Sequence, residues 1–272
     1  MPTGIIYDVS QERIKGPGTD YYKHMDSAVY ERRINTPAKS PEYFEQFHKP
    51  LVERAKERFG TPIHVLDIAC GPANELEFFK NDPDVIPIAT DISEKILQEA
   101  KDKIGEKAHL FASDVTLPAI RENSVEAGML VNAMVYVPDK MLSAMHQALK
   151  PGGECVVNLR LFNNIRNKVF YGSYAERGGN LFDRELTVDI EGVSHVFKMK
   201  VLDYTECVNK DGTPDLEIRQ LGQQMYFQSV EDVEKLIKGI GYEIVDHKTF
   251  QFASPVNPKN EVDVYTLQKP LT

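Results

Sequence analysis

Three aspartates are the residues of this chain best placed to bind a ligand. Asp67 lies at the end of an apolar run over 63–68, and Asp91 and Asp114 directly follow two later apolar runs. Carboxylates accept hydrogen bonds from hydroxyl and amino groups, as a nucleoside ligand would require. If each run is a parallel strand, the acids meet at the carboxyl edge of one sheet, where open α/β sheets bind ligands. The alternative is that each acid caps a helix, a role that Asp also favours.

Small residues follow the first acid, in the order Asp67, Ala69, Gly71 and Ala73. The pattern predicts a strand, a tight turn and a helix N-terminus, whose free N–H groups and small side chains let a ligand lie against the backbone. A dinucleotide fingerprint would need glycine at Ala69, Gly71 and Asn74, and a P-loop would need a Gly-Lys-Ser/Thr triplet that this chain lacks. Because alanine disfavours positive φ, the two alanines predict a turn that keeps φ negative there.

A regular alternation of strands and helices positions these residues. Apolar runs predict buried parallel strands at 63–68, 85–90, 108–112, 127–131 and 154–159, and further strands near 242–249 and 262–268. Ser93, Asp139 and Ser229 are the expected helix caps. The expected fold is α/β: a doubly wound, Rossmann-like, seven-stranded and mostly parallel sheet with an antiparallel β insertion.

Two further segments flank or interrupt this alternation. Residues 1–40 are polar and carry several tyrosines, which favours an N-terminal lid segment, with a frayed terminus as the alternative. The domain proper spans 41–272. It opens with an amphipathic helix over 41–59, kinked at Pro50. The antiparallel insertion occupies about 183–228, with strand-like runs at 186–190, 195–208 and 216–227 and a hairpin signal at 210–213.

The composition restricts the class of protein. The 272 residues carry a formal charge of -9, which argues against a broad nucleic-acid-binding face. No apolar run is long enough to span a bilayer. The three cysteines favour reduced core thiols and a cytoplasmic location, and without paired Cys or His at ligand spacing we expect no metal site.

Taken together, the ordered motifs resemble those of class I S-adenosylmethionine (SAM)-dependent methyltransferases. These motifs are Asp67 with its turn, Asp91, Asp114 and Lys150-Pro151-Gly152-Gly153. The resemblance implies that SAM is the cofactor, with Asp91 on the ribose hydroxyls and Asp114 on the adenine amino group. The positions that it places at the cofactor are Asp67, Ala69, Cys70, Gly71, Asp91, Ile92, Asp114, Val115 and Asn132. Tyr22 and Tyr30 are also expected at the cofactor, because an aromatic face attracts a sulfonium as it attracts an ammonium.

The insertion narrows the resemblance to glycine N-methyltransferase and its small-molecule branch. Residues 201–205, 211–214, 132–139 and 160–165 are similar to segments of that enzyme. The resemblance implies that Asn132 and Arg160 hold the acceptor. A guanidinium binds a carboxylate through two parallel hydrogen bonds, although a surface ion pair is the alternative for Arg160.

Tyr136 is the third residue expected at the acceptor, with buried packing as its alternative. The expected acceptor is a small molecule, best an amine or an amino-acid-like nitrogen. Methylation of oxygen or carbon, an RNA or protein substrate, and a non-catalytic SAM-binding protein remain open, as does assembly into a homo-oligomer.

Overall fold

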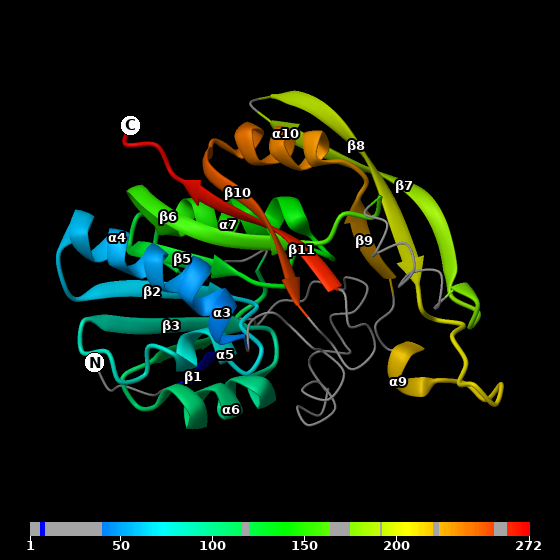
Figure 1. The fold of residues 1–272 in the computed structure, drawn as a ribbon, viewed down its shortest axis with the longest axis horizontal. Helices are drawn as coiled ribbons and strands as arrows, with labels where there is room; N and C mark the ends of the chain where they lie inside the picture. The colour runs from blue at the N-terminus through cyan, green and yellow to red at the C-terminus, as the bar shows by residue number, and fades with distance from the viewer. Residues whose placement is uncertain are drawn as a thin grey trace.

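The computed structural model describes residues 6–8, 40–115, 120–163, 175–190, 192–219, 223–252 and 260–272. Its centre is an eight-stranded sheet in which only the two pairings made by β11 are antiparallel (Figure 1). From one edge to the other, the strands are β1 (Ile6–Asp8), β4 (His109–Ala112), β3 (Val85–Asp91), β2 (Ile63–Ile68), β5 (Val125–Leu130), β6 (Leu149–Leu159), β11 (Asn260–Gln268) and β10 (Glu243–Phe252).

This sheet confirms the predicted fold class. The seven expected strands are present, and β1 pairs in parallel with β4 as an eighth strand at the edge. The order β4-β3-β2-β5-β6 places β3 and β5 on opposite sides of β2, so the direction of winding reverses at β2. In open α/β sheets, ligands bind at the carboxyl ends of the strands at such a point.

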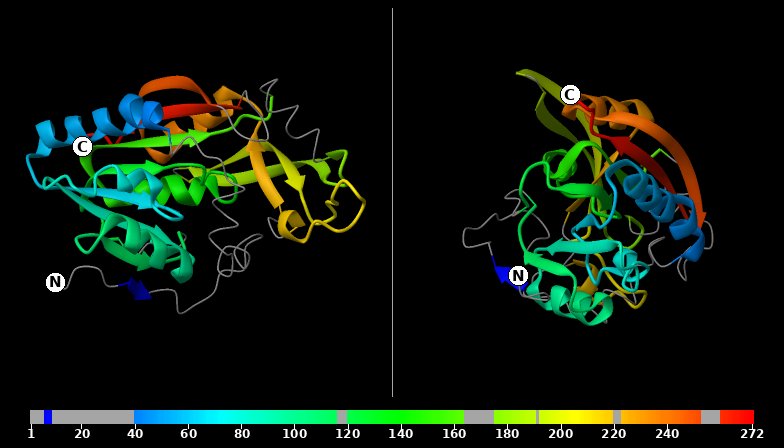
Figure 2. Two further views of the ribbon diagram at one scale, coloured as in Figure 1. Left: turned by 60° about the horizontal axis from the view of Figure 1, so that its bottom comes forward. Right: turned by 90° about the vertical axis from the view of Figure 1, so that its left-hand side faces the viewer.

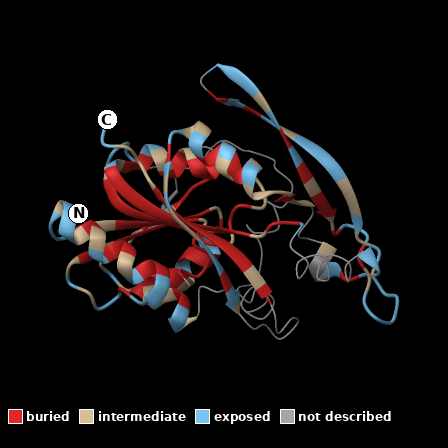
Figure 3. Ribbon diagram, turned by 45° about the horizontal axis from the view of Figure 1, so that its top comes forward, coloured by how far each residue is buried: buried red, intermediate tan, exposed pale blue. Residues whose placement is uncertain are grey.

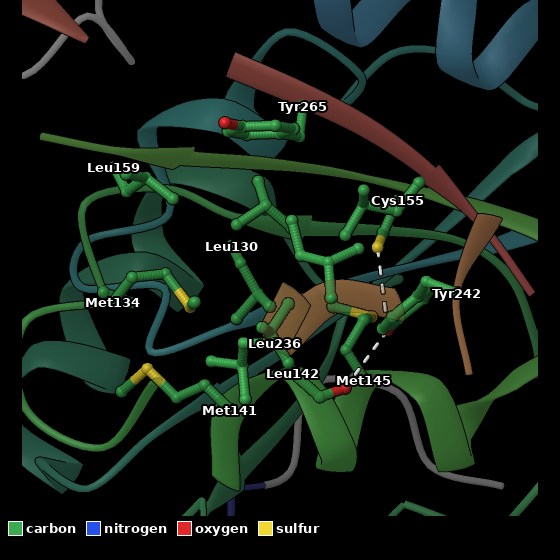
Figure 4. Close-up of a cluster of buried hydrophobic side chains, with 14 of the residues drawn as sticks. Leu130, Met134, Met141, Leu142, Met145, Cys155, Leu159, Leu236, Tyr242 and Tyr265 are labelled. Carbon is green, nitrogen blue, oxygen red and sulfur yellow. Dashed lines mark hydrogen bonds between the residues drawn. The ribbon is translucent and has the colours of Figure 1, made fainter. Parts of the chain in front are cut away.

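Helices cover both faces of the sheet. The described helical elements are α3 (Pro41–Tyr43), η2 (Phe44–His48), α4 (Lys49–Phe59), α5 (Asn74–Glu77), α6 (Glu94–Ile104), α7 (Pro138–Ala148), α9 (Leu216–Arg219) and α10 (Val230–Ile240). One buried cluster joins a sheet face to α7 and α10, and a second joins the other face to α4, α5 and α6. In Figure 4, Met141 and Met145 of the first cluster lie beneath β-strand side chains, and the Tyr242 hydroxyl donates to the Leu142 carbonyl at 3.1 Å.

Helix starts agree with the sequence at two of the three predicted caps. Ser93 accepts from the Ile96 amide at 3.3 Å and Ser229 accepts from the Asp232 amide at 3.1 Å. The prediction for Asp139 is wrong, because α7 already begins at Pro138 and Asp139 lies in its first turn. Proline suits the first helical position, where its missing N–H costs no hydrogen bond.

The helix expected over 41–59 is present, and a short π-helix interrupts its regular α-helical hydrogen bonding. The five residues Phe44–His48 form a π-helix directly before Pro50. Pro50 has no N–H to donate to the carbonyl four residues earlier, so the regular α-helical bonding pattern is interrupted there. The wider π turn accommodates that interruption.

The insertion forms a separate antiparallel sheet in the order β7 (Asn180–Ile190), β8 (Val193–Asp203) and β9 (Gln223–Phe227). It lies beyond the carboxyl ends of the parallel strands (Figures 1 and 2). One face of the β7–β8 hairpin is buried in the cluster that contains α10, through Val188, Ile190, Phe197 and Met199, whereas Val193 and Val196 near the turn are exposed (Figure 3). The antiparallel insertion predicted over 183–228 is therefore confirmed.

Two details of that prediction were wrong. The first part of the expected strand 216–227 is the short helix α9, which follows Pro214, a residue that cannot donate to a strand ladder. The hairpin signal at 210–213 forms only a tight loop, in which the Thr213 amide donates to Asp211 and a single bridge joins Val208 to Pro214. The long hairpin turns instead between β7 and β8.

A buried carboxylate holds three parallel strands together at the opposite edge of the sheet. Glu126 of β5 is 4% exposed and accepts from the His64 amide of β2 at 2.6 Å and from the Lys150 ammonium of β6. Burial raises the pKa of Glu126, but the hydrogen bonds from His64 and Lys150 outweigh burial and hold the pKa at about 2.

Glu126→Gln should therefore lower the free energy of unfolding by about 2 kcal/mol at pH 7, because an amide cannot accept from both donors. The native pKa lies below the unfolded value, so this contribution is complete above about pH 4.5 and disappears as the pH falls toward 2. Urea unfolding of both proteins across this range measures it. The exposed control Glu57→Gln should change little, and a gap between wild type and Glu126→Gln that does not shrink on acidification would contradict the assignment.

Candidate active site

The turn after β2 adopts a conformation that its residues do not favour. Ala69, Gly71 and Ala73 have φ angles of 56°, 53° and 55°. The prediction of negative φ at the two alanines is wrong. Long-range bonds impose the left-handed backbone: the Cys70 amide donates to the Thr90 carbonyl at 3.0 Å, and the Gly71 amide donates to Asp91 Oδ2 at 3.0 Å. A non-glycine residue in this region carries a strain of about 1–2 kcal/mol, a feature that clusters at ligand sites.

Ala69→Gly should raise the free energy of unfolding by up to about 1 kcal/mol, because glycine adopts positive φ without the clash of Cβ. Urea unfolding measures the change. The matched control is Ala100→Gly in α6, where φ is ordinary and glycine should destabilise by about 1 kcal/mol. Equal destabilisation by both substitutions would show that the turn at Ala69 is unstrained.

Asp91, at the end of β3, connects this turn to the next helix. Its carboxylate is 8% exposed and accepts from the amides of Gly71 and Ser93, both at 3.0 Å. Burial raises the pKa of Asp91, and those backbone donors oppose the rise. A carboxylate offers about four acceptor positions, so Asp91 retains the capacity to accept from a hydroxyl pair.

Asp67 lies behind the same turn. It is 1% exposed, and its Oδ2 has no hydrogen-bond partner among the described residues. Burial raises the pKa of Asp67 well above its usual range, and the charges of Glu75 and Asp91 add to the rise. A buried carboxylate oxygen without a donor is costly, which points to a ligand or water that supplies the missing hydrogen bond.

The remaining predicted cofactor positions that the structure describes directly follow the ends of β2, β3 and β4. Asp114, after β4, is 7% exposed, and the preceding Ser113 amide donates to the Asp91 carbonyl at 2.9 Å. Ile92 and Val115 are half-buried beside these acids in sequence, and the Cys70 thiol donates to the Gly71 carbonyl at 3.2 Å. Tyr22 and Tyr30 lie outside the described residues.

The segment after β5 carries the predicted acceptor residues. Asn132 has a φ of 56°, its amide donates to Asn158 Oδ1 at 2.6 Å, and its side-chain Nδ2 is buried without a described partner. The Tyr136 hydroxyl accepts from Gln224 at 2.9 Å.

Arg160, after β6, donates to Asn260 at 3.3 Å and lies 5.5 Å from the ring centre of Phe252. Because β5 and β6 are parallel neighbours, Asn132 and Arg160 follow adjacent strand ends.

Sequence reasoning missed three buried polar residues of this centre. Glu75 in α5 is 5% exposed, and Tyr43 and Asn158 are fully buried. Burial raises the pKa of the Tyr43 phenol, which interacts with both Asn158 and Glu75. A polar Asn158 inside the apolar run 154–159 was the available signal.

These residues fit SAM, the cofactor that the sequence resemblance implies. Asp91 keeps acceptor positions for ribose hydroxyls, the positive-φ turn presents backbone beside it, and Asp67 Oδ2 is a buried carboxyl oxygen that lacks a donor among the described residues. A ligand with a diol and a positive charge complements this set. Within the described ranges, no group of three His, Cys, Asp or Glu side chains is arranged to hold a metal ion.

Comparison with known sequences supports this interpretation. A sequence family described as "Methyltransferase domain" matches residues 65–153, which contain the turn, Asp91, Asp114 and Asn132. No curated protein sequence matches the chain. No helix in the described part of the chain is both long and apolar enough to cross a membrane.

Solved structures share the fold at low sequence identity. A SAM-dependent methyltransferase from Methanosarcina mazei is 15% identical, with a TM-score of 0.57 over 82% of this chain and 98% of that one. The magnesium protoporphyrin IX methyltransferase of Synechocystis, bound to S-adenosylhomocysteine (SAH), is 11% identical, with a TM-score of 0.58 over 92% and 97%. A Burkholderia thailandensis 1,6-didemethyltoxoflavin N1-methyltransferase with its substrate and SAH is 13% identical, with a TM-score of 0.51 over 96% and 93%.

Proposed function

We propose that this chain is a class I SAM-dependent methyltransferase and that it methylates a small molecule, best an amine or amino-acid-like nitrogen. The match of residues 65–153 to the methyltransferase-domain family and the shared fold support the proposal. The observation that carries the proposal is that Asn132 and Arg160 follow the ends of the adjacent parallel strands β5 and β6. The Burkholderia protein, which has this fold, is named for methylation of a ring nitrogen.

On the cofactor side, each acid has a distinct proposed role. Asp91 accepts the ribose hydroxyls, Asp114 accepts from the adenine amino group, and Asp67 faces the positively charged end. SAM, when bound, supplies a methyl group that its sulfonium already activates. The protein must therefore chiefly hold the acceptor in line and exclude water, and positioning of this kind is worth about 7–11 kcal/mol.

On the acceptor side, the proposed contacts suit an amino acid or a related amine. The Arg160 guanidinium is suited to two parallel hydrogen bonds with a carboxylate. The buried Nδ2 of Asn132 has no described partner and donates naturally to a second oxygen. The insertion sheet lies beyond these strand ends and is placed to close the acceptor side (Figure 2).

The other candidates have weaker support. An RNA substrate requires a basic surface, which a formal charge of -9 disfavours. Methylation of oxygen or carbon needs the same positioning and stays open to a test with a panel of acceptors. Binding without turnover would instead indicate a non-catalytic SAM-binding protein.

Asp91→Ala should weaken the binding of SAM and SAH at least about tenfold, because hydrogen bonds to a charged group are worth about 1.5–3 kcal/mol each. Isothermal titration measures this, and Asp91→Asn tests the charge while keeping one acceptor oxygen. The control is Asp102→Ala on the exposed face of α6. Wild-type affinity in both Asp91 variants would overturn the proposed cofactor contact.

Arg160→Ala should raise the KM for acceptors that carry a carboxylate at least about tenfold, because the charge-assisted pair is lost. It should leave amines without a carboxylate unchanged. Initial rates against matched pairs of amino acids and decarboxylated amines measure the difference, with the exposed Arg184→Ala as the control. An equal effect on both acceptor classes would remove Arg160 from carboxylate recognition.

A further inference from the structure

Asn158 of β6 is a fully buried amide bonded to the segment that carries Asn132. Its side chain is 0% exposed, and its Oδ1 accepts from the Asn132 backbone amide at 2.6 Å. A backbone N–H can only donate, so this contact fixes the orientation of the Asn158 side chain, with Oδ1 toward Asn132. The bond gives a reason for a polar side chain between the buried, apolar Val157 and Leu159.

The backbone of Asn132 depends on contacts of this kind. Its φ of 56° lies in the left-handed region, which is uncommon for residues other than glycine. Such backbone persists where the surrounding structure imposes it. The next two residues, Ala133 and Met134, are 6% and 3% exposed and pack into the buried cluster that contains α7 and α10. This packing and the bond to Asn158 together hold the turn, and with it the direction of the Asn132 side chain.

The same strand leads to Arg160, which directly follows the end of β6. Side chains of a strand alternate between its faces, so Asn158 and Arg160, two positions apart, share a face. The contacts agree with this. Val156 belongs to the buried cluster that contains α4, and Arg160 lies 5.5 Å from the ring centre of Phe252, which packs against that cluster. Asn158 therefore joins the two residues proposed to hold the acceptor.

We propose that Asn158 is a positioning residue that fixes Asn132 relative to Arg160, so that together they hold the acceptor carboxylate in one place. Only one chain length between carboxylate and nitrogen then brings the nitrogen to the methyl group. The substrate class is therefore amino acids of a single chain length. This inference rests on the proposed function and deepens it.

Asn158→Leu tests the inference because it keeps the size of the side chain and removes the acceptor for the Asn132 amide. We expect kcat/KM for the preferred amino acid to fall at least about tenfold, since a displaced contact loses the reactive geometry. The ratios of kcat/KM among glycine, 3-aminopropanoate and 4-aminobutanoate should move toward one, whereas a merely structural role would lower all three alike. Asn158→Asp keeps an acceptor oxygen and should retain the wild-type ratios.

Asn132→Gly separates positioning from folding. Glycine adopts positive φ without strain, so this variant keeps the turn and removes only the side chain that Asn158 positions. It should flatten the ratios by itself, which tests the inference even where Asn158→Leu does not fold. Adding Asn158→Leu should cause no further loss of kcat/KM, because both changes remove the same contact. The matched control is Asn123→Gly before β5, where φ is 53° and the side chain is exposed.

Thermal melting and titration with SAH accompany each variant. SAH affinity should stay within about threefold, because Asp91 and its turn are unchanged, and a tenfold loss would place Asn158 on the cofactor side and overturn the inference. No turnover of any acceptor by wild type would overturn the proposed function and this inference with it. Wild-type turnover without a preference for one chain length, an equal loss for all three amino acids, or a further loss in the double variant would overturn the inference alone.

Discussion

The carboxylate of Asp91 is the interaction on which the cofactor side depends. By accepting from both Gly71 and Ser93, it ties the turn after β2 to the start of α6 across the gap between two strands. The turn makes these bonds with a left-handed backbone at Ala69 and Ala73. Strain at two alanines is thus the local cost of bringing backbone, carboxylate and helix N-terminus to one point.

The buried polar groups at the amino ends of the parallel strands differ from those at the carboxyl ends in how many hydrogen-bond partners they have. At the amino ends of the parallel strands, Glu126 is fully supplied with donors from His64 and Lys150, and its pKa is depressed accordingly. At the carboxyl ends, Asp67 Oδ2 and Asn132 Nδ2 are buried without described partners. The first arrangement stabilises the folded chain, whereas the second leaves polar groups that we propose a ligand satisfies.

The acceptor side is assembled from parts that are distant in the sequence. Asn158 of β6 accepts from the Asn132 amide, and β9 of the insertion sheet holds Val135 and Tyr136 through Met225 and Gln224. The methyltransferase domain at residues 65–153 contributes the segment after β5, but the residues that fix its conformation lie outside that match.

Local patterns determined much of this protein. Apolar periodicity placed β2 at 63–68, Ser93 and Ser229 were identified as caps, and the order of the acidic strand ends pointed to the cofactor. The tertiary structure alone decided the left-handed alanines, the buried Glu75 and Tyr43, and the hydrogen bond from Gln224 to Tyr136, which lies 88 residues away. The physical reason is range: strand and cap signals act within a few residues, whereas backbone strain, burial of polar groups and amide orientation are imposed by contacts between distant strands.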